Sequence, residues 1–280
     1  MPAGTPSSRP GSDLTVRAAL VQFRPALRDK ETNLDTTERI VSSGDHDLYI
    51  FPEMSVTGYS LLDDNYTMAE AVNGPSIARL KEISAEHGAS ILAGLPMPAG
   101  DRGYVHNSAV YVAPDGDVEV YYKHHLVNFG PFDERYYFRP GRGLTTFELG
   151  GMTFGIIICF DVFFPELVKA YAMRGVDAII DMSASPSVTR VYFERVLPAR
   201  SIENTIYSLY TNLVGTEKSL VFWGGCQAFD PRGNLTAKGP YFEEGVVSVE
   251  IDPETVAASR PFRPTIGETD PAFREYADSL

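Results

Sequence analysis

The sequence has few cysteines and no long apolar run, and both shortages exclude classes of protein. Two cysteines, Cys159 and Cys226, are too few among 280 residues to build a disulfide framework. Each is therefore either a buried small hydrophobic side chain or a reactive thiol, and we expect a reducing, cytoplasmic location. The longest apolar runs are about half of the roughly 20 residues that a membrane span needs, so we expect a soluble protein.

Positive charge is also scarce. Aspartate and glutamate outnumber lysine and arginine by 37 to 24, which gives a formal net charge of -13. Such a chain is repelled by nucleic-acid phosphates and by anionic lipid surfaces, so we expect neither as a partner, but a small molecule or a protein. The five histidines show no metal-motif spacing and no cysteine cluster accompanies them, so we expect no metal and no other cofactor.

What is present is an ordinary globular composition, with 44% hydrophobic and 22% charged residues, and it predicts one large domain. Residues 1–13 are rich in proline, serine and glycine and lack the apolar stretch of a signal peptide, so we expect a disordered tail. Residues 14–260 are predicted to form the domain. Residues 261–280 are polar and contain proline, and they are predicted to form a C-terminal extension that packs along the surface or against a partner subunit.

Short β-branched runs bounded by turn residues predict strands, and longer amphipathic patterns between them predict helices. The predicted strands are residues 14–23, 48–51, 90–95, 108–112, 118–122, 153–159 and 178–182. The predicted helices are residues 33–43, 76–87, 166–174 and 191–203. Beyond Ile206 the pattern consists mainly of strands, and hairpin turns are predicted at residues 114–116 and 230–233. This mixture predicts an α/β fold with layers around a mixed sheet.

Each of three predicted strands ends at a side chain that can act in catalysis. Cys159 is one of these side chains. The apolar run of residues 155–158 precedes it, and Pro165 then opens a helix. In α/β sheets ligands bind beyond the carboxyl ends of the strands, where amides or a helix N-terminus can stabilise a thiolate or an oxyanion. Burial statistics alone favour an inert, buried cysteine. Whether Cys159 is structural or reactive therefore has to be judged from the neighbouring residues.

Glu53 and Lys123 follow two other predicted strands. A partly buried Glu53 at the same sheet edge would have a raised pKa, in the range that suits a general base. Lys123, beside carboxylates, could remain protonated and donate a hydrogen bond to an oxyanion. Taken singly, each also fits a surface glutamate or a lysine that extends its charge into solvent. Together, the three strand ends indicate a catalytic site.

These residues stand in motifs by which the chain resembles the nitrilase superfamily of carbon-nitrogen hydrolases. The resemblance runs from about residue 15 to residue 251, with Glu, Lys and Cys in the family's order and at similar spacing. The matching segments are FPEMSVTGY at 51–59, YKHHL at 122–126, ERYYFRPG at 134–141, GIIICFDVFFPE at 155–166, ARSIEN at 199–204 and GGCQAFDPRG at 224–233. Cys226 departs from the pattern, because serine is more usual there, and it is interpreted as structural.

The resemblance implies a four-layer αββα sandwich over residues 14–260 and a role for each motif residue. Glu53 would be the general base, Lys123 would stabilise the tetrahedral intermediate, and Cys159 would form a thioester. Glu134 would position Lys123 and the substrate, and Tyr59 and Phe160 would support substrate binding. Superfamily members commonly form dimers and larger assemblies, so we expect at least a homodimer, with residues 260–280 crossing between subunits.

Several neighbouring residues have less decisive interpretations. Arg200 and Glu203 lie three residues apart on a predicted helix, where an ion pair would support the site structurally. His124 and His125 are expected to pack beside the active loop. Some aromatic residues are expected to line a substrate pocket and others to fill the core: Phe129, Phe132, Tyr136, Phe160 and Phe164.

The residues after Cys159 favour one branch of the superfamily. True nitrilases tend to be longer and to follow the cysteine with Trp-Glu, whereas Phe160 and Asp161 follow it here, which looks more like the amidase branch. The predicted reaction is hydrolysis of a linear amide to a carboxylic acid and ammonia. The alternatives are hydrolysis of N-carbamoyl amines or amino acids, hydrolysis of nitriles, acyl or amidino transfer to an amine, and a scaffold without catalysis.

Overall fold

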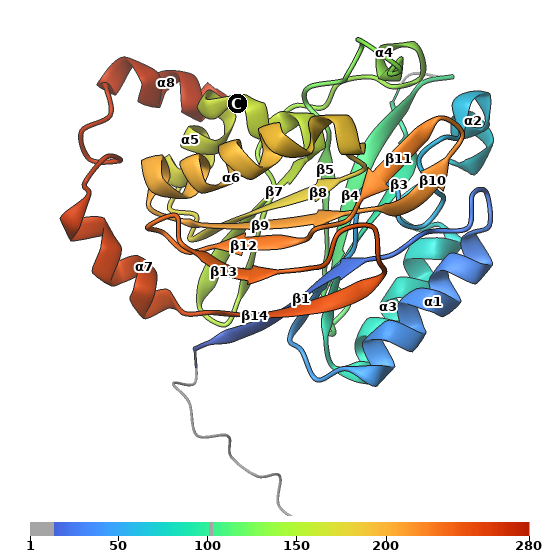
Figure 1. Ribbon diagram of the computed structural model, residues 1–280, viewed down its shortest axis with the longest axis horizontal. Helices are drawn as coiled ribbons and strands as arrows, with labels where there is room; N and C mark the ends of the chain where they lie inside the picture. Colours follow the sequence, from blue (N-terminus) through green and yellow to red (C-terminus); the bar gives the residue numbers. More distant parts are fainter. Residues whose placement is uncertain (1–13, 101–102, 280) are drawn as a thin grey trace, which may run out of the picture.

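The computed structural model describes residues 14–100 and 103–279, and two six-stranded sheets form its centre (Figure 1). The predicted tail, residues 1–13, lies outside the described residues. The first sheet has the order β14 (Gly245–Ile251), β1 (Val16–Gln22), β2 (Leu48–Ile50), β3 (Ser90–Pro98), β4 (Val105–Val112) and β5 (Val118–Tyr122). The second has the order β13 (Leu235–Lys238), β12 (Gln227–Phe229), β9 (Tyr207–Asn212), β8 (Ala178–Ser183), β7 (Met152–Ile158) and β6 (Thr146–Leu149).

Both sheets are mixed in the same way, with a parallel centre and antiparallel flanks. In the first sheet β1, β2 and β3 run parallel, and in the second β7, β8 and β9 do. Parallel neighbours need crossover connections, which usually contain a helix. The crossovers here carry α1 (Lys30–Ser43), α3 (Pro75–His87), α5 (Pro165–Met173) and α6 (Arg190–Asn204). A small third sheet pairs β10 (Val214–Glu217) with β11 (Leu220–Trp223).

The helices cover the outer faces of the two sheets, so the molecule has four layers. Helices α1 and α3 pack on the first sheet, and α5 and α6 on the second (Figure 1). Between the sheets lies a continuous apolar core to which both contribute, for example Leu20 and Ile50 from the first and Ile156 and Ile180 from the second. The predicted αββα sandwich is therefore confirmed.

The predicted strands and helices are all present, with shifts at their ends. The strand predicted at residues 108–112 begins three residues earlier, at Val105, and both predicted hairpin turns join antiparallel strands. Sequence analysis missed β6 and the short helical elements: η1 (Leu62–Asp64), α2 (Asn65–Met68), α4 (Glu134–Tyr137), η2 (Cys159–Phe163), η3 (Ser187–Thr189), α7 (Pro253–Ser259), η4 (Arg260–Phe262) and α8 (Pro271–Ser279). Such short turns bury too few side chains to leave a periodic pattern.

The C-terminal segment packs on its own chain. Helix α8 lies beside α5 (Figure 1), Ala277 is buried there, and Arg174 Nη2 donates to the Ala277 carbonyl at 3.3 Å. Whether residues 261–279 also contact a partner subunit stays a prediction.

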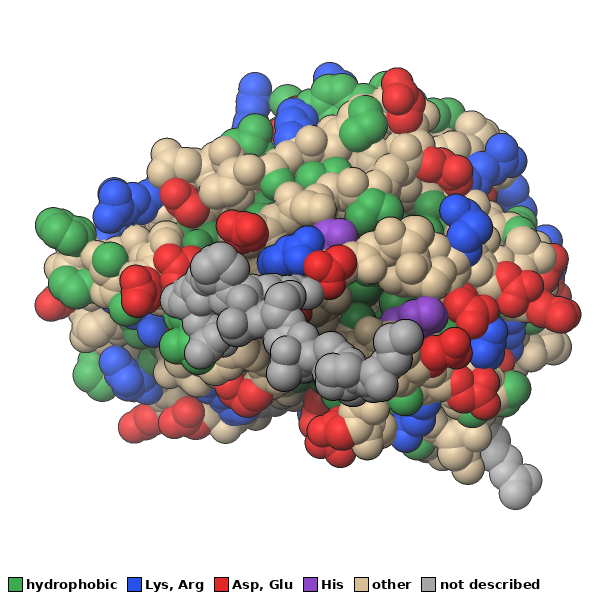
Figure 2. Space-filling model, turned by 90° about the horizontal axis from the view of Figure 1, so that it is seen from below, with side chains coloured by type: hydrophobic (Ala, Val, Ile, Leu, Met, Phe, Trp, Pro, Cys, Tyr) green, Lys and Arg blue, Asp and Glu red, His purple; other side chains and the backbone are tan. Residues whose placement is uncertain are grey.

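Acidic and basic side chains are interspersed over the face seen in Figure 2. Among the helices that the structure describes, none is long and apolar enough to cross a membrane.

Candidate active site

The strand ends bring Glu53, Lys123 and Cys159 together, but not along one sheet edge. Glu53 follows β2 and Lys123 follows β5, both in the first sheet, whereas Cys159 follows β7 in the second. The expectation of a shared sheet edge is therefore wrong. The sandwich packs the two sheets face to face, so the three side chains meet where the two sheets end side by side.

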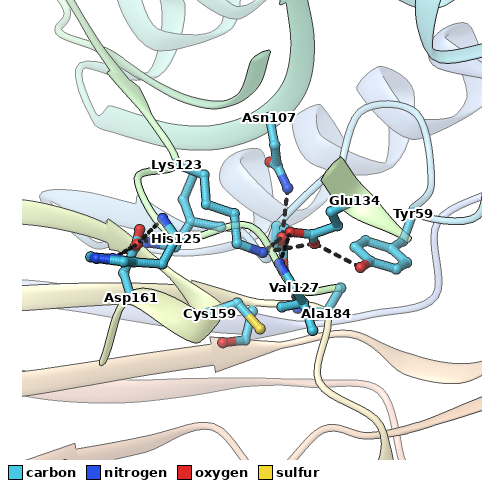
Figure 3. A network of polar contacts seen from close by, with 12 residues as sticks. Tyr59, Asn107, Lys123, His125, Val127, Glu134, Cys159, Asp161 and Ala184 are labelled. Carbon is cyan, nitrogen blue, oxygen red and sulfur yellow. Dashed lines mark hydrogen bonds and ion pairs between the residues drawn. The ribbon is translucent and has the colours of Figure 1, made fainter. Parts of the chain in front are cut away.

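Lys123 joins two buried carboxylates. Its Nζ donates to Glu53 Oε1 at 2.8 Å and to Glu134 Oε1 at 2.8 Å, as the dashed lines in Figure 3 show. The side chains of Lys123 and Glu53 are wholly buried and that of Glu134 is nearly so. Such charges persist in an interior only when they are paired and hydrogen-bonded, and each of these has a partner of opposite charge.

Burial and charge set the protonation of this group. Burial raises the pKa of Glu53, and the charge of Lys123 and its hydrogen bond only partly oppose that shift. Burial acts to lower the pKa of Lys123, but the charges of Glu134 and Glu53 outweigh it and hold that pKa well above its ordinary value. Lys123 is therefore an ammonium at neutral pH, and Glu53 is easier to protonate than a surface glutamate.

Three donors fix the carboxylate of Glu53. Besides Lys123, Asn107 Nδ2 donates to Oε1 at 2.7 Å, and the backbone N–H of Ala184 donates to Oε2 at 2.7 Å. Ala184 follows β8 in the second sheet, so one carboxylate bridges both sheets. This arrangement holds Glu53 rigidly and orients its oxygens toward the ends of β7 and β8.

Glu134 is held from two sides. The Tyr59 hydroxyl donates to Glu134 Oε1 at 2.7 Å, and the backbone N–H of Val127 donates to Oε2 at 2.9 Å. The backbone of Tyr59 is anchored in turn, because its N–H and that of Ser60 donate to Glu217. The structure thus brings the predicted supporting residues Tyr59 and Glu134 to Lys123.

Cys159 sits at a sharp turn between β7 and η2. Its φ is +51°, a left-handed conformation that costs a residue other than glycine about 1–3 kcal/mol, and its N–H donates to Asp181 Oδ1 at 2.6 Å. Burial and the charge of Glu53 raise the pKa of the Cys159 thiol well above its ordinary value, and Lys123 opposes them only in part. Figure 3 shows its sulfur on the side of Ala184. The thiol is therefore neutral at rest and needs a base.

Asp161 stabilises this turn. Its Oδ1 accepts from the backbone N–H of His125 at 2.8 Å, and its Oδ2 accepts from Tyr121 Oη at 2.8 Å and from the Ile158 N–H at 3.1 Å. The His125 ring stacks on Phe164, with 3.4 Å between the centroids. His124 stacks on Tyr121. The histidines thus pack beside the loop, as predicted.

The predicted pair on α6 also supports the turn. Arg200 Nη1 lies 2.5 Å from Glu203 Oε1, and Arg200 Nε donates to the Val162 carbonyl at 2.7 Å. Val162 belongs to η2, the turn that begins with Cys159. The pair therefore connects α6 to the turn that carries Cys159, in agreement with a structural role.

A cavity of about 470 Å³ opens beside Cys159. Of the aromatic residues singled out by sequence, Phe129, Phe132 and Phe160 line it. Phe164 lines a neighbouring pocket instead, and Tyr136 is 72% exposed and lines neither. Tyr59 and Phe163 also contribute to the walls.

Sequence reasoning missed three groups: Asn107, Asp181 and the Ala184 N–H. Asn107 is a buried amide in β4, one residue before the strand predicted from sequence, and Asp181 is a buried carboxyl in the apolar strand β8. For Asp181, a polar residue inside an apolar run was the available signal. Burial raises the pKa of Asp181 well above its ordinary value, and its Oδ1 accepts the Cys159 N–H. A backbone amide such as that of Ala184 leaves no signal in a sequence.

Two features lie apart from this site. Cys226 is fully buried, its Sγ donates to the Val21 carbonyl at 3.5 Å, and burial raises its pKa to about 12. Glu38, Glu86 and His87 place potential ligand atoms within 4.8 Å of one another on α1 and α3. Arg79 forms an ion pair with Glu38, so the charge of Glu38 is balanced without a metal ion.

The chain is similar to several known proteins along most of its length. A protein named nitrilase from Pyrococcus abyssi is 32% identical over 245 residues, covering 85% of this chain and 90% of that protein. A structure of a superfamily protein from Xanthomonas campestris, with an arsenic adduct in its active site, is 26% identical at a TM-score of 0.84, covering 91% of this chain and 97% of that one. The amidase of Nesterenkonia sp. AN1, in complex with acrylamide, is 26% identical at a TM-score of 0.83, covering 96% and 99%.

The family assignment rests on sequence as well as on fold. The family model for carbon-nitrogen hydrolases matches residues 17–261, which includes every residue of the cluster described above. The chain is thus a member of the carbon-nitrogen hydrolase family and a hydrolase of the nitrilase superfamily.

Proposed function

We propose that the protein is a cysteine-dependent amidase that hydrolyses a linear amide to a carboxylic acid and ammonia. One observation supports this above the others: Lys123 joins the buried carboxylates of Glu53 and Glu134 at 2.8 Å each, directly beside a thiol at the floor of a cavity. The structurally similar amidase that was solved with acrylamide supports the same reaction class.

In the first half-reaction Cys159 attacks the amide carbon. The thiol is neutral, so its proton passes to the Glu53 carboxylate as the bond between sulfur and carbon forms. The carbonyl oxygen becomes an oxyanion, which the Lys123 ammonium stabilises. Glu53 then returns the proton to the nitrogen, the carbon-nitrogen bond breaks, ammonia leaves, and a thioester remains on Cys159.

In the second half-reaction water replaces ammonia. Glu53, again a carboxylate, takes a proton from water as the hydroxide attacks the thioester, and the thiolate leaves and regains that proton from Glu53. The raised pKa of Glu53 suits both directions of transfer, because it is closer to neutrality than that of a surface glutamate. Lys123 keeps its proton throughout, since its pKa is held well above the ordinary value.

The ureido and nitrile alternatives use the same residues, so the test compares substrates directly. Ammonia release is measured from primary amides, N-carbamoyl amines and nitriles with the wild type, with Cys159→Ala and with the control Cys226→Ser. We expect release from amides by the wild type and by Cys226→Ser, and none by Cys159→Ala. Release from ureido compounds or nitriles alone would move the assignment to those reactions.

Acyl transfer and a non-catalytic scaffold have their own readouts in the same assay. Added hydroxylamine would yield hydroxamate in place of acid if an amine is the preferred acceptor. If no substrate class releases ammonia and Cys159→Ala retains the function of the wild type in cells, the protein is a scaffold and the proposal is wrong.

A further inference from the structure

The walls of the cavity beside Cys159 form one chain of aromatic rings. Each ring contacts the next edge-on or tilted, with centroids separated by less than the roughly 7 Å at which aromatic pairs attract. The chain runs Tyr59–Phe132 at 6.4 Å, Phe132–Phe129 at 6.3 Å, Phe129–Phe160 at 5.4 Å, Phe160–Phe163 at 5.8 Å and Phe163–Phe193 at 4.9 Å. All six rings line the same cavity as the thiol.

The cavity is much larger than a short amide requires. Its volume is about 470 Å³. An apolar protein cavity of about 150 Å³ is enough to hold benzene. The space beside Cys159 therefore admits an aromatic ring together with the chain that links it to the carbonyl, and a two- or three-carbon amide would leave most of it unfilled.

Three of the hydroxyl groups in the walls are already engaged. Ser185 Oγ and Thr189 Oγ1 lie 2.6 Å apart and bond to each other, and Trp223 Nε1 donates to Ser185 Oγ at 3.3 Å. The Tyr59 hydroxyl is used by Glu134. A polar acyl group would lose its hydration on entry and find few free partners, which is unfavourable.

Charge argues against cationic acyl groups. No carboxylate is among the described residues that line the cavity, and Arg195 is the one charged side chain among them. Arg195 is exposed and has no ion pair among the described residues, so it lies at the rim and repels cations. Aromatic rings also attract cations, but a cation here would meet Arg195 without a compensating acid.

We infer that this cavity selects amides whose acyl group carries an aromatic ring without a positive charge, and that short aliphatic amides are poor substrates. The inference rests on the proposed amidase function and adds its substrate class. Binding of the ring to walls far from the scissile bond supplies energy that raises kcat/KM.

The test is a matched series: propionamide, 3-phenylpropionamide, 3-cyclohexylpropionamide and the 4-trimethylammonio derivative of 3-phenylpropionamide. We expect kcat/KM for 3-phenylpropionamide to exceed that for propionamide about 100-fold, since burial of a phenyl group contributes on that scale. The kcat/KM for the cyclohexyl compound should fall between these two values, because its saturated ring fills the volume but cannot form aromatic pairs with the walls. The cationic derivative should be the worst of the ring-bearing compounds.

One variant removes a ring and one serves as its control. Phe129 contacts two rings of the chain and is 55% exposed, so Phe129→Ala is compatible with folding. We expect about a tenfold loss of kcat/KM for 3-phenylpropionamide and a smaller loss for propionamide. Phe262 is 84% exposed and lies outside the cavity, so Phe262→Ala should change neither value.

Rates, together with the affinity of the Cys159→Ala protein for the amides, separate failure of this inference from failure of the proposed function. If propionamide is hydrolysed as well as 3-phenylpropionamide, the amidase assignment stands and the inference is overturned. If no amide is hydrolysed, calorimetry with the Cys159→Ala protein decides: tighter binding of 3-phenylpropionamide than of propionamide supports the aromatic site, and equal binding overturns it. Preference for the cationic derivative would also overturn it.

Discussion

The two cysteines of this chain share burial and a raised pKa, yet their surroundings differ in every other respect. Cys226 is enclosed in the core, where its S–H donates to a backbone carbonyl and no carboxylate or lysine among the described residues shifts its pKa. Cys159 occupies a left-handed turn beside Glu53, Lys123 and a cavity. Burial is common to both thiols, and only Cys159 also has a carboxylate and a cavity beside it, which is the basis for proposing it as the nucleophile.

Replacement of the Cys159 thiol should have the largest effect, and replacement of the Cys226 thiol serves as its control. Cys159→Ala should lower kcat for amide hydrolysis by about 10⁴-fold or more, because no other nucleophile can form the acyl-enzyme. Cys226→Ser should stay within about twofold, since the hydroxyl can also donate to the Val21 carbonyl. Circular dichroism checks that both variants are folded. If the two folded variants lost kcat to a similar extent, the two cysteines would not differ in function.

Removal of the ammonium should have the next largest effect. Lys123→Met leaves Glu53 and Glu134 buried without their cation, which should lower kcat by about 10³-fold and destabilise the fold by about 3–5 kcal/mol. Urea titration measures the stability. Lys238→Met, which removes a partly exposed lysine that does not line the cavity, is the control and should leave kcat unchanged. A fully active Lys123→Met enzyme would show that the oxyanion is stabilised by other groups.

The pH profile gives a third comparison. Glu53 must be ionised to take the thiol proton, and burial raises its pKa, so kcat/KM should fall as the pH decreases through a midpoint above the ordinary glutamate range. Because the Cys159 pKa is raised well above its ordinary value, no further gain from free thiolate is expected near neutral pH. A profile that instead rises through a thiol-like midpoint near pH 8–9, the range of about 8.5 for free cysteine, would contradict this assignment.

The smallest effect should come from the hydroxyl that supports Glu134. Tyr59→Phe removes one hydrogen bond of 2.7 Å and keeps the ring in the cavity wall, so we expect about a tenfold loss of kcat with an unchanged preference for ring-bearing amides. Tyr136→Phe, on an exposed ring, is the matched control. If Tyr59→Phe changed the preference and left kcat intact, the hydroxyl would act on the substrate and not through Glu134.

The strands, the central helices and the catalytic candidates were predictable because each leaves a local pattern. Glu53, Lys123 and Cys159 all follow apolar runs, and the motifs around them carry the family resemblance. The meeting of these side chains across two sheets was not predictable from strand ends alone, since one mixed sheet fits the same alternation of strands and helices. The Ala184 N–H and the ring chain from Tyr59 to Phe193 depend on tertiary contacts between segments distant in sequence.

The most direct test of the account is the rate at which iodoacetamide alkylates Cys159 at pH 7 in the wild type and in Glu53→Gln. Glutamine has the same shape and keeps a carbonyl oxygen for Lys123 and Asn107, but it cannot accept the thiol proton. If Glu53 deprotonates Cys159, the variant should react about 100-fold more slowly, in line with the contribution of a positioned base. Equal rates in the two proteins would show that Cys159 is activated without Glu53 and would contradict the central claim.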